Sequence, residues 1–154
     1  MANDRIMAWE VLEAVGKESS VKKKVRILQN MDCPALRHIL KGGFDPNVKW
    51  LLPTGSPPNY KPDDAPAGLQ LQSIHQQTPK FYLFVQAGVD SGKCGNLSQS
   101  KREQLFVQML ESLHAKEAQL LIDMKDQNIK YNGLTVKLIN DAFPGLIAET
   151  GKWQ

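Results

Sequence analysis

The segment 130–145 reads KYNGLTVKLINDAFPG and carries the clearest structural signals of the chain. Its Asn-Gly pair favours a turn, after which Thr135 can cap a short helix that a Pro-Gly pair ends. Val136, Ile139 and Phe143 recur at helical spacing, so we expect them to form one buried face. The segment therefore predicts a loop, a capped helix start and a short amphipathic helix.

The start of this helix has the chemistry of a phosphate-binding site. The first amides of a helix lack acceptors within it and lie at the positive end of its dipole. Gly133 has no side chain to hold off a sugar-phosphate backbone, and Lys137 lies in the first turn. The simpler interpretation is that the helix packs one apolar face and binds nothing.

Composition predicts a soluble globular protein. The chain has 154 residues, of which 42% are hydrophobic and 23% charged, and this length suffices for one domain with a sizeable core. No apolar run approaches the roughly 20 residues of a membrane span, and the polar N-terminus lacks a signal-peptide pattern. Cys33 and Cys94 lie far apart, which favours reduced thiols in a cytoplasmic protein, with a single disulfide as the alternative.

The positive charge is localised. The net charge is only +3, but residues 17–41 hold seven basic and two acidic residues, a local charge of 7 − 2 = +5. Residues 51–127 hold seven basic and eight acidic residues and are nearly neutral. A basic patch of this kind is what a nucleic-acid-binding protein needs. It is equally what a solvated, lysine-rich helix face looks like.

Apolar side chains at helical spacing predict three helices in residues 1–43. Their predicted caps are Asn3 or Asp4, Ser19 or Ser20, and Asp32, and glycines at Gly16 and Gly42-Gly43 are expected to end the first and third. The second helix is the basic one. It should bury Val21, Val25 and Leu28 and present Lys22, Lys23 and Arg26 to solvent.

The remainder predicts further short helices around one long loop. Pro46 to Leu52 can add one or two helical turns, and five prolines in residues 53–68 then favour an extended surface loop, with a linker between two small domains as the alternative. The run 81–85 suits a helix or a buried strand equally. Ser100 and Glu103 form a capping-box pair before another helix. We therefore expect an all-α, single-domain bundle of about seven or eight short helices spanning residues 1–154.

Patterns for catalysis are incomplete. The string GVDSGK at residues 88–93 imitates a phosphate-binding P-loop, but it is one residue short and Cys94 replaces the Ser or Thr that would bind magnesium. The three histidines and two cysteines have no metal-ligand spacing, and nothing marks either thiol as an activated nucleophile. We expect no enzymatic activity, no cofactor and no bound metal.

Four passages carry a resemblance that spans nearly the whole chain. They read EAVG at 13–16, KESSVKKK at 17–24, VKWLLP at 48–53 and GLTVKLINDAFPGLI at 133–147. With them, the chain resembles the N-terminal DNA-binding domain of phage-type ATP-dependent DNA ligases, here as a stand-alone module. It is also similar to small uncharacterised proteins of large tailed phages, which would place it in the host cytoplasm.

The resemblance implies an all-helical module that lies on double-stranded DNA and contacts the minor groove and phosphates through helix starts and lysines. The residues that it assigns to DNA binding are Gly16, Lys17, Ser19, Ser20, Lys22, Gly133, Leu134, Thr135 and Lys137. The neighbouring cations Lys23, Arg26 and Lys130 are expected to contribute as well.

A ligase also needs the motif Lys-x-Asp-Gly, and the nearest string, KPDD at residues 61–64, lacks the glycine. The expected function is therefore sequence-independent binding of duplex or nicked DNA without catalysis. The alternative is a phage accessory module that binds a host or replication protein.

Overall fold

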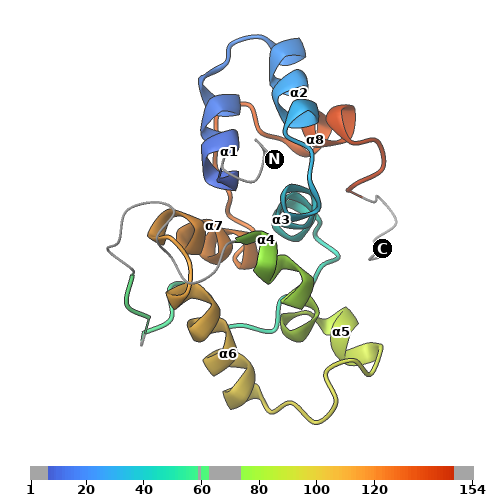
Figure 1. Cartoon of the computed structure of the whole chain (residues 1–154). Coiled ribbons are helices and arrows are strands. Elements are labelled where there is room, and N and C mark those ends of the chain that lie inside the picture. The colour runs from blue at the N-terminus through green and yellow to red at the C-terminus, as the bar shows by residue number, and fades with distance from the viewer. Residues whose placement is uncertain (1–6, 59, 63–73, 148–154) are drawn as a thin grey trace.

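The chain folds as an assembly of short helices, as predicted. The computed structural model describes residues 7–58, 60–62 and 74–147. Within these ranges it contains eight α-helices, one 3₁₀ helix and no strand (Figure 1). The helices are α1 (Ala8–Lys17), α2 (Val21–Asn30), α3 (Pro34–Phe44), α4 (Ile74–Gln77), the 3₁₀ helix η2 (Thr78–Phe84), α5 (Gln86–Asp90), α6 (Gln99–Glu111), α7 (Ala115–Lys125) and α8 (Val136–Ala142).

Local capping chemistry sets several of the helix starts. Ser20 and Thr135 cap α2 and α8 as predicted, because their hydroxyls accept the amides of Lys23 and Leu138 at 3.4 and 3.2 Å. Three other helices begin after residues that differ from their predicted caps. Met7 precedes α1, whereas Asn3 and Asp4 lie outside the described residues; Cys33 rather than Asp32 caps α3; and Ser98 rather than Ser100 caps α6.

The predicted end of α3 at Gly42-Gly43 was wrong, because both glycines lie inside the helix and are buried. A Cβ at Gly42 would lie 2.6 Å from the ring of Trp50, and one at Gly43 would lie 2.4 Å from the side chain of Ile129. The glycines therefore let neighbouring side chains approach the α3 backbone closely. Gly16 likewise did not end α1, which continues to Lys17.

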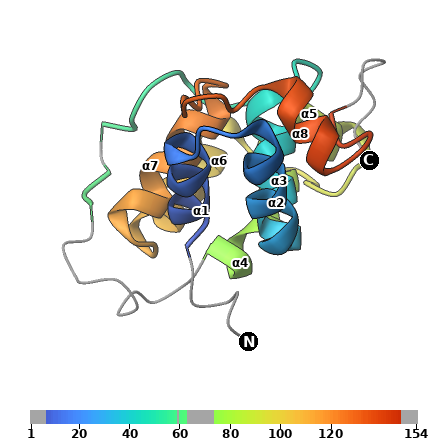
Figure 2. The same ribbon diagram turned by 90° about the horizontal axis from the view of Figure 1, so that it is seen from above.

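One cluster of buried side chains joins the helices. It includes Leu12 of α1, Leu28 of α2, Ile39 of α3, Leu121 of α7 and Ile139 of α8. Helix α7 packs against α1, α3 and α6, while α2 packs against α1 and α8. Figures 1 and 2 show α1, α2 and α8 at one end of the molecule and α5 and α6 at the other.

The segment between α3 and α6 departs from its predicted form. The run 81–85 forms neither an α-helix nor a strand but most of η2, and Val85 makes a single antiparallel bridge with Trp50. Residues 46–52 form no helix but include one hydrogen-bonded turn, in which the amide of Val48 donates to the carbonyl of Asp45 at 3.1 Å. The described part of the proline-rich loop has no regular structure and is held by Lys125, whose ammonium donates to the carbonyls of Pro53 and Gly55 at 2.8 and 2.7 Å. The rest of this loop lies outside the described residues.

A carboxyl group is buried in the first turn of α7. Burial raises the pKa of Glu117 to about 7; the amide of Ile74 pulls this pKa down and the charge of Glu10 pushes it up. An unfolded glutamate has a pKa of about 4.5, so between these two values the folded protein holds a proton that the unfolded chain releases. The resulting stability is complete below pH 4.5 and is lost as the pH rises through 7.

We predict that Glu117→Gln removes this pH dependence. Relative to the variant, the wild type should lose up to ~3 kcal/mol of unfolding free energy between pH 5 and 8, at 1.4 kcal/mol per pKa unit. Urea denaturation across this range measures the difference. Glu111→Gln, at an exposed carboxylate, should keep the wild-type profile. Parallel profiles for the wild type and Glu117→Gln would show that Glu117 is ionised in the fold.

Candidate nucleic-acid interface

Helices α2 and α8 pack against each other. Near their starts, the ammonium of Lys24 donates to the carbonyl of Asn132 at 2.9 Å. Near their ends, the amide of Gln29 donates to the carbonyl of Ala142 at 3.2 Å. The two segments singled out in the sequence, 16–26 and 130–137, are therefore neighbours in space.

Lys24 fastens these segments together. Lys24 is only 5% exposed, and its ammonium also donates to the carbonyl of Val15 at 2.6 Å. It thus joins the end of α1 to the loop before α8 from a position in α2. Hydrogen bonds from a charged donor are stronger than those between neutral groups, so this contact holds the turn and the loop in place.

Gly133 has a structural role next to Lys24. Its φ is +74°, in the left-handed region that glycine tolerates best. A Cβ at this position would lie 2.9 Å from both Cε and Nζ of Lys24. The absence of a side chain at Gly133 therefore makes room for the side chain of Lys24. The sequence analysis had explained this glycine differently, by the approach of a phosphate backbone.

Most of the predicted DNA-contacting residues are exposed. These are Lys17, Ser19, Lys22, Lys23, Arg26, Lys130, Gly133, Thr135 and Lys137. Gly16 and Ser20 are half-buried, and Gly16 lies against the loop before α8, where its carbonyl accepts the side-chain amide of Asn132 at 3.5 Å. Leu134 is buried, so its side chain belongs to the core and cannot contact a ligand.

Several backbone amides at the start of α2 are already hydrogen-bonded. The carboxylate of Glu18 accepts the amides of Ser19 and Ser20 at 3.0 and 3.2 Å. The Ser20 hydroxyl is itself engaged in capping. Only the amides of Val21 and Lys22 in the first turn lack acceptors within the helix. A ligand at this end would therefore be attracted mainly by lysine and arginine side chains.

The exposure of three residues in this region differs from its prediction. Lys24 was counted among the surface cations but is buried, and Val21 and Val136 were predicted to be buried but are 61% and 41% exposed. The valines are the first residues of α2 and α8. A residue at the first helical position projects past the packed face, so its spacing alone does not bury it. Lys24 is buried by contacts with distant segments, and no local sequence pattern predicts such contacts.

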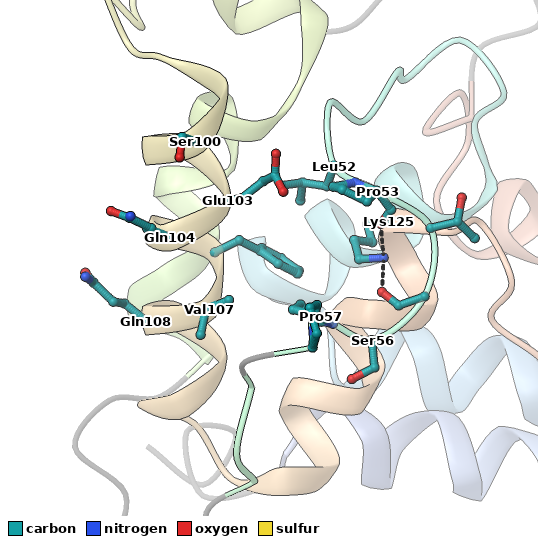
Figure 3. A pocket seen from close by; sticks show the side chains of 14 residues that line it. Leu52, Pro53, Ser56, Pro57, Ser100, Glu103, Gln104, Val107, Gln108 and Lys125 are labelled. Atoms are coloured by element: carbon teal, nitrogen blue, oxygen red, sulfur yellow. Dashed lines mark hydrogen bonds between the residues drawn. The ribbon is translucent and has the colours of Figure 1, made fainter.

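A cleft of about 560 Å³ lies between the proline-rich loop and α6 (Figure 3). Pro53, Ser56 and Pro57 line one side, and Glu103 and Gln104 line the other. The Lys125 ammonium at its edge is already bound to loop carbonyls. The lining carries the hydroxyls of Thr54, Ser56 and Ser100 and contains no histidine.

A second cavity, of about 470 Å³, lies at the start of α3 and is lined in part by Cys33 and His38. The Cys33 sulfur accepts the amide of Leu36 at 3.4 Å, and burial lowers the pKa of His38. Arg37 binds Asp32 through two contacts of 2.7 and 2.8 Å, and this pairing holds the pKa of Asp32 below its usual value. The cavity is thus lined by groups engaged in capping and ion pairing.

Cys33 and Cys94 are both free thiols, which agrees with the expectation of reduced cysteines. In the described part of the chain, no three His, Cys, Asp or Glu side chains gather as a metal would require. No helix within the described ranges is long and apolar enough to cross a membrane.

In its described residues the protein is all-helical, with a basic region in which α2 packs against α8 and Lys24 contacts the loop before α8. The chain belongs to the Family of unknown function (DUF6433), whose sequence profile matches residues 11–131. The match includes α2 and Lys130 and ends before α8. No curated protein and no solved structure matches the chain.

We predict that Lys24→Met destabilises the fold by about 1–3 kcal/mol, because it removes a charged donor from two carbonyl groups. Chemical denaturation followed by circular dichroism measures the loss. Lys23→Met is the matched control, since it makes the same change at the adjacent exposed position and should alter the stability by less than about 0.5 kcal/mol. Equal effects of the two substitutions would contradict the role assigned to Lys24.

We predict that Gly133→Ala also destabilises the protein, by about 1–3 kcal/mol, through its positive φ and its contact with Lys24. Gly92 also has a positive φ, of +79°, but its Cβ position is open. Gly92→Ala therefore isolates the cost of backbone conformation. If the two variants lose equal stability, the contact with Lys24 contributes nothing.

Proposed function

We propose that this protein is a non-enzymatic module that binds duplex or nicked DNA through its basic end without reading the base sequence. The observation that carries the proposal is the pairing of α2 with α8, which joins two cationic segments into one surface. The segments 16–26 and 130–137 together hold seven basic residues and one acidic residue. Six of the seven remain after Lys24 is set aside as a buried structural group.

The charges suit phosphate oxygens better than base edges. Lys22, Lys23 and Arg26 are exposed along α2, and Lys130 and Lys137 are exposed beside it. Among the described residues, these cations form one ion pair, a long contact of 3.5 Å between Lys137 and Asp141, both of which are well exposed. Such flexible, hydrated cations attract the DNA backbone strongly but carry little sequence information.

The packing of α2 against α8 brings their cations to within the scale of a DNA groove. Packed helices have axes about 8–10 Å apart, and the grooves of B-DNA are about 6 and 12 Å wide. We therefore expect cations of the two helices to contact the backbone on either side of one groove. The resemblance to the DNA-binding domain of phage-type ligases supports the same placement, including contact with the minor groove. It also supports a role in a phage, in the cytoplasm of its host.

We infer no catalytic step for this chain, because the nucleotidyl-transfer motif of ligases is absent from its sequence. The alternative proposal is a phage accessory module that binds a host or replication protein. The exposed valines at the two helix starts favour this alternative if the surface lacks affinity for DNA.

Salt dependence distinguishes the two proposals. Gel-shift titrations of the full chain with several unrelated duplexes, with and without a nick, should give similar affinities that fall steeply as salt rises. Lys22→Ala combined with Lys137→Ala removes one cation from each helix. This variant should weaken binding to all duplexes alike and reduce the slope of log K against log salt by about two.

The matched control is Lys93→Ala combined with Lys101→Ala, which removes the same charge from exposed positions after α5 and in the first turn of α6. These two helices lie at the end of the molecule away from α1 and α2 (Figure 1). It should change the affinity little. Equal weakening by both pairs would show diffuse attraction rather than a defined surface. Absence of DNA binding by the wild type at low salt would reject the proposal in favour of a protein partner.

A further inference from the structure

A buried carboxyl group links the start of α7 to the start of α4. Glu117 lies in the first turn of α7 and is only 3% exposed. Among the described residues, its hydrogen-bond donor is the amide of Ile74, the first residue of α4. A carboxylate accepts up to about four hydrogen bonds, so one amide compensates its charge poorly in a buried position. The contact between Glu117 and α4 therefore suits the protonated carboxyl group.

The titratable groups beside Glu117 do not offset its charge. Glu10 of α1 adds a like charge, which acts together with burial to raise the pKa of Glu117. The ammonium of Lys116 lies over the ring of Trp9, at 5.7 Å from the ring centroid. In α4, His75 follows Ile74, and its Nε2 is buried without a hydrogen-bond partner in the described part of the chain.

Buried cations of the other helices packed against α7 are engaged elsewhere. Lys41 of α3 pairs with Asp45 at 2.9 Å. Arg102 of α6 donates to the carbonyl of Leu83 at 2.9 Å. Ionisation of Glu117 therefore places a charge at the junction of α1, α4 and α7 that neither of these cations neutralises.

We propose that ionisation of Glu117 releases α4 from α7 while the rest of the helical fold persists. A buried carboxylate regains water when the segment above it moves away, so loss of the proton favours every opening that exposes this group. Helix α4 is a single turn of four residues, and it packs against η2 and α3. Its release is thus a small, local opening of the kind that precedes global unfolding.

The opening ends within η2, whose last residues are fastened to other segments. The amide of Leu51 donates to the carbonyl of Phe84 at 2.7 Å, and Arg102 holds the carbonyl of Leu83. Val85, directly after η2, bridges to Trp50. None of these contacts involves Glu117, so they keep this part of the chain in place when α4 is released.

Native-state hydrogen exchange of the full chain tests the proposal. The exchange rate of an amide, divided by that of an unstructured amide at the same pH, gives its opening constant. For the Ile74 amide this constant should rise about 70-fold between pH 5 and 8, because the carboxyl has a pKa of about 7 when buried and 4.5 when exposed. It should also exceed, at each pH, the opening constant of Leu121, a fully buried residue of α7.

Glu117→Gln keeps an acceptor for the Ile74 amide but cannot ionise, so its opening constant should stay level across this range. His75→Gln is the matched control, since it removes the other titratable group of α4 and should keep the wild-type rise. Circular dichroism checks that both variants fold. The carbon-13 signal of the Glu117 carboxyl in the wild type needs no variant, and it should titrate over the range in which Ile74 opens.

A level profile for Ile74 in the wild type, or a Glu117 signal that titrates below pH 5, would overturn the proposal. A rise that survives in Glu117→Gln, or that disappears in His75→Gln, would assign the effect to another group and would overturn it equally. If Ile74 and Leu121 have the same opening constant at every pH, only the whole fold opens, and α4 is not released on its own.

Discussion

The ammonium group of Lys24 is the contact on which the basic end of the molecule depends. It donates to the carbonyls of Val15 and Asn132, so one side chain holds the end of α1, the first turns of α2 and the loop before α8. Gly133 is needed beside it because any Cβ there would meet the lysine. With Lys24 turned inward, its neighbours Lys22, Lys23 and Arg26 face solvent. A buried cation thus orients the exposed ones.

The sequence predicted those features of the fold that depend on neighbours in the chain. Ser20 and Thr135 cap their helices because a hydroxyl three residues before an amide can reach it within one turn. The prediction that Asp32 caps α3 was wrong. Cys33 lies one residue closer to the helix and caps it, while Asp32 pairs with Arg37. Gly42 was wrongly predicted to end the helix. A glycine is needed there because the ring of Trp50, from another segment, packs against its backbone.

The sequence predicted two cationic segments but not how they lie relative to each other. Local charge marked residues 17–41 and helix-start chemistry marked residues 130–137, yet the contact between them joins residues 108 positions apart, which no periodicity encodes. At the start of α2, Glu18 accepts the amides of Ser19 and Ser20, and the Ser20 hydroxyl accepts that of Lys23, which leaves few amides for a ligand. Attraction for a polyanion must therefore come chiefly from side chains, which makes it strongly dependent on salt and weakly dependent on sequence.

We propose that α2, α8 and the loop before α8 form a single surface for duplex DNA. Nuclear magnetic resonance of the isotope-labelled chain, titrated with a short duplex at low ionic strength, tests this surface because every amide reports separately. The largest shifts are expected to fall together in residues 17–26 and 130–137 and to saturate at the same DNA concentration. Shifts centred on the cleft between the proline-rich loop and α6, or changes in only one of the two segments, would contradict it.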